Sequence, residues 1–206
     1  MQAEKKQDIR KLTLEELEVY FLSVGEKKFR AKQVYEWLWN KSLKNFDEMS
    51  NISKSTREIL KEKFTINHIL VDQFQRSTDG TIKNAVKLYD NNIVESVLIP
   101  TSKRITACVS SQVGCSLDCN FCATARLKRM RNLNPDEIYD QVVAIQEEAS
   151  LYFDRPLTNI VFMGMGEPLL NYQNVLSAID KICSPEGLGI SPKRITLSTV
   201  GIGKMI

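Results

Sequence analysis

The chain has 206 residues, of which 43% are hydrophobic and 26% are charged, and its formal net charge is +3. These values are ordinary for a globular protein, so they exclude collagen-like, coiled-coil and wholly disordered chains. No run approaches the roughly 18 to 20 apolar residues that span a bilayer. The polar segment 1–11 also lacks the apolar core of a secretory signal. We therefore expect a cytoplasmic protein.

The first seventy residues predict a small helical domain. Thr13 and Glu16 have the spacing of a capping box, in which each side chain satisfies the other residue's backbone N–H. Apolar residues then repeat at helical spacing until Gly25, a typical end of a helix. Two further helices are expected over about 30–41, with Trp37 in the core, and from Ser53 or Ser55 onwards.

From Val71 the sequence changes to a period of two. Two alternating runs, Ile82–Leu88 and Ile93–Ile99, flank the polar turn Tyr89–Asn92, which predicts a β-hairpin. Pro100 follows the second run and is expected to end it. We expect this hairpin to form an extension between two domains.

After residue 101 the sequence alternates between strands and long helices. Strands are predicted at Ile105–Ser110, Asn159–Phe162 and Arg194–Thr199, with helices at Pro135–Tyr152 and Tyr172–Cys183. Such alternation is typical of an α/β fold with a parallel sheet. The predicted domains are 1–70 (helical), 71–101 (hairpin) and 102–206 (α/β).

Three of the five cysteines lie in one loop directly after the first predicted parallel strand. Cys115, Cys119 and Cys122 have the spacing C-x3-C-x2-C, and three thiolates can hold three irons of a 4Fe–4S cluster. A structural zinc site would need a fourth protein ligand. That ligand would have to come from Cys108, Cys183 or His68, so zinc or unligated thiols are the alternatives.

Longer segments around this loop are more specific. They are Cys108–Cys115 (CVSSQVGC), Phe162–Asn171 (FMGMGEPLLN) and Thr196–Gly201 (TLSTVG). Together with the cysteine spacing they resemble the radical S-adenosylmethionine (SAM) superfamily, and within it the RlmN family. Residues 28–38 resemble the N-terminal domain of the same family.

This resemblance implies a radical SAM methyltransferase that methylates C2 of an adenine in 23S rRNA and in tRNA through a methyl-cysteine intermediate. It implies a partial (β/α)6 barrel, of which this chain holds the first half, and a 4Fe–4S cluster with SAM as cofactors. An external electron donor such as a flavodoxin system and a monomeric state are also expected. Family members are longer and carry a second catalytic cysteine near the C-terminus, so we expect a truncated chain that is inactive alone.

The resemblance also assigns residues. Cys115, Cys119 and Cys122 would hold the cluster, whereas Gly166, Glu167 and Ser198 would bind SAM. Glu95 matches the family's proton acceptor and Cys108 its second thiol, which resolves the protein–RNA adduct.

Strand alternation bears on both catalytic residues. It places Cys108 on one face with Thr106 and Ser110, opposite Ala107 and Val109, which would pack on helices. It places Glu95 on a face that is otherwise apolar, with Ile93, Val97 and Ile99, where burial would raise its pKa. A buried structural cysteine and an exposed edge-strand charge are the alternatives.

Residues 102–131 carry six basic and one acidic side chain. We expect RNA phosphate contacts from the cations that follow the cysteine loop, which are Arg126, Lys128, Arg129 and Arg131. Solvated surface charge is the ordinary alternative. Two other functions remain open, namely a Cfr-type adenine-C8 methyltransferase and a non-catalytic metal-binding RNA module.

Overall fold

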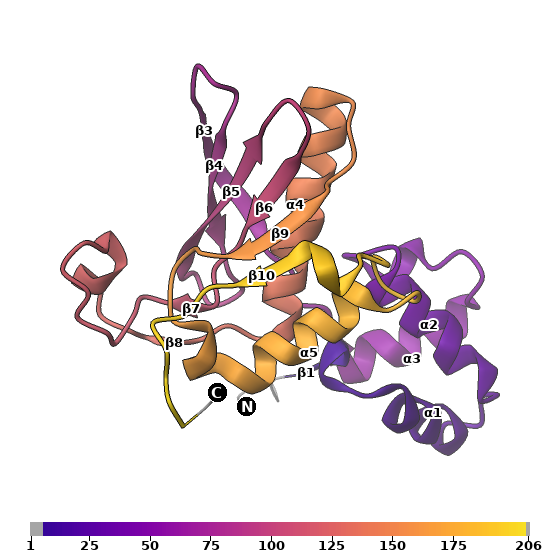
Figure 1. The fold of residues 1–206 in the computed structure, drawn as a ribbon. Coiled ribbons are helices and arrows are strands. Elements are labelled where there is room, and N and C mark those ends of the chain that lie inside the picture. Colours follow the sequence, from indigo (N-terminus) through magenta and orange to yellow (C-terminus); the bar gives the residue numbers. More distant parts are fainter. Residues whose placement is uncertain (1–5, 205–206) are drawn as a thin grey trace. The chain divides into compact units, whose positions relative to one another are not determined.

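The computed structural model describes residues 6–204 (Figure 1). Contacts divide these residues into two compact units. The described residues up to Asn67, together with Pro185–Leu188, form the first unit. His68–Ser184 and the described residues from Gly189 onwards form the second.

The first unit is mainly helical. Thr13 and Glu16 form the predicted capping box at the start of α1, with Thr13 N–H donating to Glu16 Oε2 over 2.8 Å and Glu16 N–H to Thr13 Oγ1 over 3.2 Å. Ser53 caps α3 in the same way, accepting from Thr56 N–H at 3.1 Å. The elements in chain order are β1 (Gln7–Asp8), η1 (Ile9–Lys11), α1 (Leu14–Ser23), α2 (Phe29–Trp39), η2 (Phe46–Glu48), α3 (Lys54–Lys63) and β2 (Phe64–Thr65), and β1 pairs with β2.

The core of this unit differs from the prediction at one tryptophan. The buried face of α2 consists of Ala31, Val34, Leu38 and Trp39. Trp37 is only partly buried, because its Nε1 donates to Asn51 Oδ1 over 2.6 Å and Lys41 Nζ lies 3.6 Å from its ring centroid. Assigning Trp37 to the core was therefore wrong.

The second unit is built on a six-stranded sheet. In chain order its strands are β3 (Leu70–Arg76), β4 (Ile82–Lys87), β5 (Ile93–Pro100), β6 (Ile105–Cys108), β9 (Asn159–Phe162) and β10 (Ile195–Leu197). Their order in the sheet is β10-β9-β6-β5-β4-β3, with β10, β9 and β6 parallel and the remaining pairs antiparallel. This mixed α/β arrangement confirms the predicted fold class.

The hairpin β4–β5 was predicted, but its partners were not. Strand β5 pairs directly with β6, so the hairpin continues the sheet of the parallel strands. The edge strand β3 was not predicted as a strand. Nearly all of its side chains are exposed, so it lacks the buried alternation that marks a strand in sequence.

The sheet has one covered and one open face. Helix α4 (Pro135–Phe153) packs on β5 and β6, and α5 (Tyr172–Cys183) packs on α4. Buried on the covered face are Ile82, Val86, Val94, Leu98, Ile105, Ala107, Ile160 and Phe162. The opposite face is called here the open face, and alternation along each strand turns the intervening side chains towards it. Strand register places five of these residues level with one another across the sheet: Lys83, Val97, Cys108, Val161 and Thr196.

Short elements close the loops that leave the parallel strands. β7 (Gln112–Val113) pairs with β8 (Arg131–Asn132), which joins the two ends of the cysteine-containing segment. That segment contains η3 (Ala123–Arg126) and extends away from the sheet in Figure 1. The remaining turns are η4 (Pro168–Asn171) and η5 (Pro192–Arg194). None of the helices in residues 6–204 is long and apolar enough to cross a membrane.

Candidate active site

The loops that follow β6 and β9 are bound to each other by backbone groups. Ser111 N–H donates to Met165 O over 2.8 Å, and Gly164 N–H donates to Val109 O over 3.1 Å. The buried hydroxyl of Ser110 accepts from Met165 N–H at 2.8 Å and donates to the carbonyl of Glu95 at 2.5 Å. Three strands, β5, β6 and β9, are thus tied together at the carboxyl ends of the parallel pair.

Two glycines make this close approach possible. A Cβ atom at Gly164 would lie 2.7 Å from the carbonyl oxygen of Val109, and one at Gly166 would lie 2.5 Å from Cβ of Gln112. Gly166 also has φ +95°, which side chains other than glycine rarely adopt. The segment Met163–Glu167, called here the glycine loop, therefore needs glycine in order to pack on the loop after β6.

Glu167 connects a third loop to these two. The residue is only 3% exposed, and Oε1 of its carboxylate accepts a hydrogen bond from Leu169 N–H at 2.9 Å. Its Oε2 accepts from Val200 N–H, in the segment after β10, at 3.0 Å. Gln112 Oε1 in turn accepts from Glu167 N–H at 2.9 Å. One buried carboxylate thus joins the loops that follow β9 and β10.

Cys108 lies on the open face, as strand alternation predicted. It pairs with Val97 on β5 and with Val161 on β9, and it is 8% exposed. Burial raises the pKa of its thiol, although a hydrogen bond from the backbone of Met163 partly opposes this shift. The sulfur therefore keeps its proton at neutral pH.

Glu95 lies on the same face but in different surroundings from those predicted. Its carboxylate forms an ion pair with Lys83 Nζ at 3.0 Å, and its side chain is 52% exposed. The prediction of an apolar environment was wrong. Lys83 lies on the neighbouring strand β4, and the alternation within β5 alone does not reveal which residues the neighbouring strand contributes. The structure therefore gives the exposed alternative.

Ser198 follows β10 by one residue and is exposed. Alternation places it on the same face as Thr196, which is level with Val161 and hence with Cys108. Its segment is tied to the glycine loop through the Val200–Glu167 hydrogen bond.

The three predicted cluster ligands lie on one loop as partly exposed free thiols. Cys122 N–H donates to the carbonyl of Cys119 at 3.0 Å, and Leu117 N–H approaches Cys115 Sγ at 3.5 Å. Burial tends to raise the pKa of Cys122, but hydrogen bonds from Ala125 and Thr124 outweigh it and lower that pKa. Within residues 6–204, no three His, Cys, Asp or Glu side chains are gathered closely enough to hold a metal ion.

The chemistry of these donors nevertheless fits one kind of group. Three soft thiol ligands lie within eight residues, and the loop base is fixed by the β7–β8 pair and by Gly114, where a Cβ would overlap the carbonyl of Lys128. This donor set suits a 4Fe–4S cluster with one iron free of protein ligands better than a four-ligand zinc site.

The basic residues after the cysteine loop fall into two groups. Arg126, Lys128 and Arg129 are exposed. Arg131 is half-buried, and its guanidinium donates twice to the Glu137 carboxylate, over 2.7 and 2.8 Å, and once to Asp90 over 2.6 Å.

These contacts lower the pKa of Asp90 to about 2, mainly through the hydrogen bond from Arg131. They also raise the pKa of Arg131, although burial alone would lower it. Arg131 is therefore a structural residue, and we correct its assignment as an RNA contact. The sequence signal for the pairing of Arg131 with Glu137 was the position of Glu137 in the first turn of α4, six residues after Arg131.

Several buried polar residues that hold the site were not predicted. Gln141 Oε1 accepts from Ser110 N–H at 2.9 Å, and Asn171 Nδ2 donates to the carbonyls of Ser111 and Leu133 over 2.8 and 2.9 Å. For Asn171, the available signal was that a polar residue inside a long motif bears no evident chemistry of its own, whereas Gln141 lies in α4, outside those motifs. In this structure they bind backbone groups of adjacent loops.

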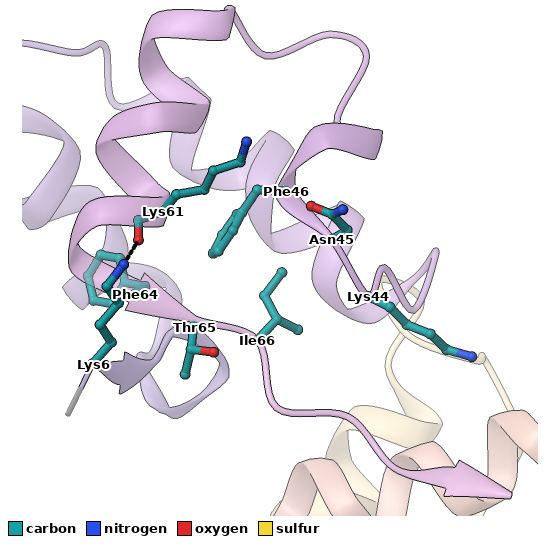
Figure 2. A pocket seen from close by; sticks show the side chains of 8 residues that line it. All are labelled: Lys6, Lys44, Asn45, Phe46, Lys61, Phe64, Thr65 and Ile66. Atoms are coloured by element: carbon teal, nitrogen blue, oxygen red, sulfur yellow. Dashed lines mark hydrogen bonds between the residues drawn. The ribbon is translucent and has the colours of Figure 1, made fainter. Parts of the chain in front are cut away.

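The first unit contains a separate hollow of about 240 Å³ (Figure 2). Lys61, on its wall, is paired with Asp47 at 2.6 Å and Glu58 at 3.0 Å, while Lys6 donates to the carbonyl of Lys61. These cations are already engaged, so we assign no site here. Its lining residues are Lys6, Lys44, Asn45, Phe46, Lys61, Phe64, Thr65 and Ile66.

Comparison with known proteins identifies two matching families. Residues 7–66 match the ribosomal RNA large subunit methyltransferase N-terminal domain, and residues 109–203 match the Radical SAM superfamily. A crystal structure of a radical SAM methyltransferase from Sphaerobacter thermophilus is similar, with a TM-score of 0.84 and 36% identity. That similarity covers 95% of this chain and 57% of the other. The radical SAM fold is thereby confirmed, and with it the expectation of a 4Fe–4S cluster and SAM.

Curated relatives extend this similarity over the whole sequence. A "Probable dual-specificity RNA methyltransferase RlmN" from Christiangramia forsetii is 71% identical over 98% of this chain and 58% of its own length. The "Dual-specificity RNA methyltransferase RlmN" from Oleidesulfovibrio alaskensis is 48% identical over 95% of this chain and 55% of its own length. The chain thus spans less than three fifths of the relatives it matches.

Proposed function

We propose, on the premise that this chain is a homologue of the RlmN proteins, that it is part of a radical SAM methyltransferase. This enzyme would methylate C2 of an adenine in 23S rRNA and in tRNA. The supporting observation is the joining of three loops at the carboxyl ends of β6, β9 and β10. Ser110, Gln112 and Glu167 bind these loops to one another, and Cys108 lies on the open face beside them.

The cofactor residues follow from this arrangement. Cys115, Cys119 and Cys122 would hold a 4Fe–4S cluster, and the glycine loop with Gly166 and Glu167 would bind SAM together with Ser198. When bound, such a cluster supplies the electron for reductive cleavage of SAM, which gives access to radical chemistry at an electron-poor carbon. The residues of this chain orient the cofactor, because the two loops that carry these groups share buried hydrogen bonds.

Cys108 and Glu95 have complementary roles in this proposal. Cys108 is the thiol that releases the methylated RNA from the protein, and burial holds the proton on its sulfur until it is needed. Glu95, on the same face and paired with Lys83, accepts the proton from the adenine carbon. A positioned carboxylate is a common general base.

The RNA contacts complete the proposal. Arg126, Lys128 and Arg129 are exposed next to the cysteine loop, where they can neutralise phosphates. The helical unit serves as an accessory RNA-binding domain. The protein acts in the cytoplasm as a monomer and receives electrons from an external donor such as a flavodoxin system.

The test is a nucleoside digest of RNA from cells that lack the full-length gene, with 2-methyladenosine measured by mass spectrometry. This nucleoside should disappear and return when the full gene is restored. A gene carrying Cys108→Ala should not restore it and should leave protein crosslinked to RNA on a denaturing gel, whereas Cys183→Ala should behave as wild type. Unchanged 2-methyladenosine, or a loss of 8-methyladenosine instead, would contradict the proposal.

A further inference from the structure

The amino ends of the parallel strands surround a second polar site, far from the loops described above. A hollow of about 380 Å³ lies there, within the second unit. Its lining residues are Lys103, Arg104, Thr158, Asn159, Lys193 and Arg194, and we call it the basic hollow. Four of its six side chains are cations, and its wall contains no acidic residue.

Strand register fixes the positions of these residues. Arg104 immediately precedes β6, Asn159 begins β9, and Arg194 immediately precedes β10. Because Ile195 pairs with Ile160, Arg194 lies level with Asn159 on the neighbouring strand. Thr106 is level with Asn159, so Arg104 is offset by two residues along the strands. At about 4.8 Å between strands and about 3.3 Å per residue, the two arginine backbones stand roughly 12 Å apart.

The backbone around the hollow is held firmly. Thr158 N–H donates to the carbonyl of Ile105 at 2.9 Å, and the Thr158 hydroxyl accepts from Ile105 N–H at 3.0 Å. Arg155 Nη1 donates to the carbonyl of Thr101 at 2.8 Å, next to the turn that carries Lys103 and Arg104. The cations therefore project from a fixed frame.

The charges of the basic hollow are not neutralised. Within residues 6–204, the cationic groups of Lys103, Arg104, Lys193 and Arg194 form no ion pair with a carboxylate. Arg131 shows the contrast, since two carboxylates occupy its donors. Asp154 is the nearest acid in sequence to the β9 side of the hollow, and within residues 6–204 it forms no ion pair with these cations. Four unpaired cations around one hollow repel each other, and a bound anion would relieve that repulsion.

We propose that the basic hollow binds the phosphate backbone of the RNA substrate, as a contact separate from the reacting end of the strands. This inference rests on the proposed function for the identity of the anion. The cations come from two separate turns, with Thr158 and Asn159 from a third segment between them, and they border an open space, which suits successive phosphates of a strand. A site for one small phosphate usually uses backbone N–H groups at a helix start, and neither α4 nor α5, the α-helices of this unit, begins at the hollow.

The geometry allows one RNA to reach both sites. Four residue steps along β6 separate Arg104 from Cys108, a distance of roughly 13 Å at about 3.3 Å per residue. Structured RNA is much larger than that, so phosphates held at the basic hollow can belong to the same molecule whose base reaches Cys108. Lys and Arg contacts to phosphate add affinity without reading sequence, so this contact would serve rRNA and tRNA alike.

The experiment measures binding of a fluorescein-labelled tRNA transcript to the 206-residue protein over a range of salt concentrations. The variant Arg104→Glu/Arg194→Glu should bind at least about tenfold more weakly, and its plot of log affinity against log salt should be shallower by about two, since each lost phosphate contact removes about 0.9. The variant Arg104→Lys/Arg194→Lys keeps the charges and should stay close to wild type. Both arginines are exposed, so unchanged circular dichroism is expected in both variants.

A second arm uses inorganic phosphate and follows the side-chain amide of Asn159 by NMR. The inference is supported if tRNA affinity falls as stated and the salt dependence becomes shallower. It is overturned if the glutamate variant binds tRNA like wild type, or if phosphate shifts Asn159 while tRNA affinity is unchanged, which would make the hollow a site for free phosphate. Neither result depends on a cluster, SAM or turnover, so the proposed methyltransferase activity would stand or fall separately.

Discussion

At the carboxyl ends of β6, β9 and β10, Glu167 and Gln112 are buried and hydrogen-bonded, whereas at the amino ends Arg104 and Arg194 are exposed and, within residues 6–204, form no ion pair. Glu167 illustrates the first end, since it is bonded to Gln112 and Val200 on two other loops as well as to Leu169 on its own. Arg104 and Arg194 illustrate the second, where charges face an open hollow. Buried polar groups here fix the geometry of the loops, whereas the exposed arginines are the groups that we propose to contact RNA phosphates.

The largest expected effect comes from breaking the close packing at the carboxyl end. Gly166→Ala should lower the free energy of unfolding by about 2 to 5 kcal/mol, because it combines an unfavourable φ with overlap against Gln112. Urea unfolding measures this. Gly201→Ala is the matched control, since Gly201 has φ +85° but open space around it, and should cost only about 1 to 2 kcal/mol. Equal losses in the two variants would mean that loop packing contributes nothing.

A second variant tests whether a cation that is paired with a buried carboxylate differs from an exposed one. Arg131→Ala leaves the buried Glu137 without its partner, and should cost about 2 to 3 kcal/mol, somewhat less than a fully buried pair. Replacement of the exposed cation Arg126 by Ala should cost within about 0.5 kcal/mol. Thermal or urea unfolding of both variants decides this, and similar stabilities would return Arg131 to the group of free surface cations.

The second ion pair of Arg131, with Asp90, predicts a pH dependence. The pKa of Asp90 is about 2 in the folded protein, below its ordinary value of 3.8. A lowered folded-state pKa contributes stability that is present above the ordinary value and is lost as pH falls towards 2. Wild type should therefore lose more stability than Arg131→Ala across this range, and parallel pH profiles would contradict the pairing.

The sequence predicted elements better than it predicted contacts between them. α5 and β9 were predicted at their observed bounds, because their apolar periodicity is strong and local. The joining of β5 to β6, the ion pair between Lys83 and Glu95 and the engagement of Arg131 were not foreseen. Each depends on strands or loops that are distant in sequence, and periodicity within one element carries no information about its neighbours.

The candidate site shows the same division. Spacing alone singled out Cys115, Cys119 and Cys122, because ligand chemistry is encoded in residue type. Ser110 and Gln141 were missed, since their function in the structure is to hydrogen-bond backbone groups rather than to react. Such supporting residues become visible only when the loops are placed beside each other.

A smaller effect is expected on ligand binding. Glu167→Ala removes the hydrogen bonds to Leu169 and Val200, so the segment after β10 loses its tie to the glycine loop. SAM binding should weaken by about 1.5 to 3 kcal/mol, the range for hydrogen bonds to a charged group. Calorimetry on the reconstituted protein measures it, with Glu186→Ala as a control outside the glycine loop. Unchanged affinity would make Glu167 purely structural.

The central claim is that the three loops at the carboxyl end form a cofactor site with one iron open to SAM. The most direct measurement is iron content and electron paramagnetic resonance of anaerobically reconstituted, reduced protein, with and without SAM. We predict about four irons per chain, a spectrum that changes when SAM is added, and loss of both in Cys119→Ala but not in Cys183→Ala. A colourless protein that holds one zinc ion, or a cluster whose spectrum ignores SAM, would contradict the claim.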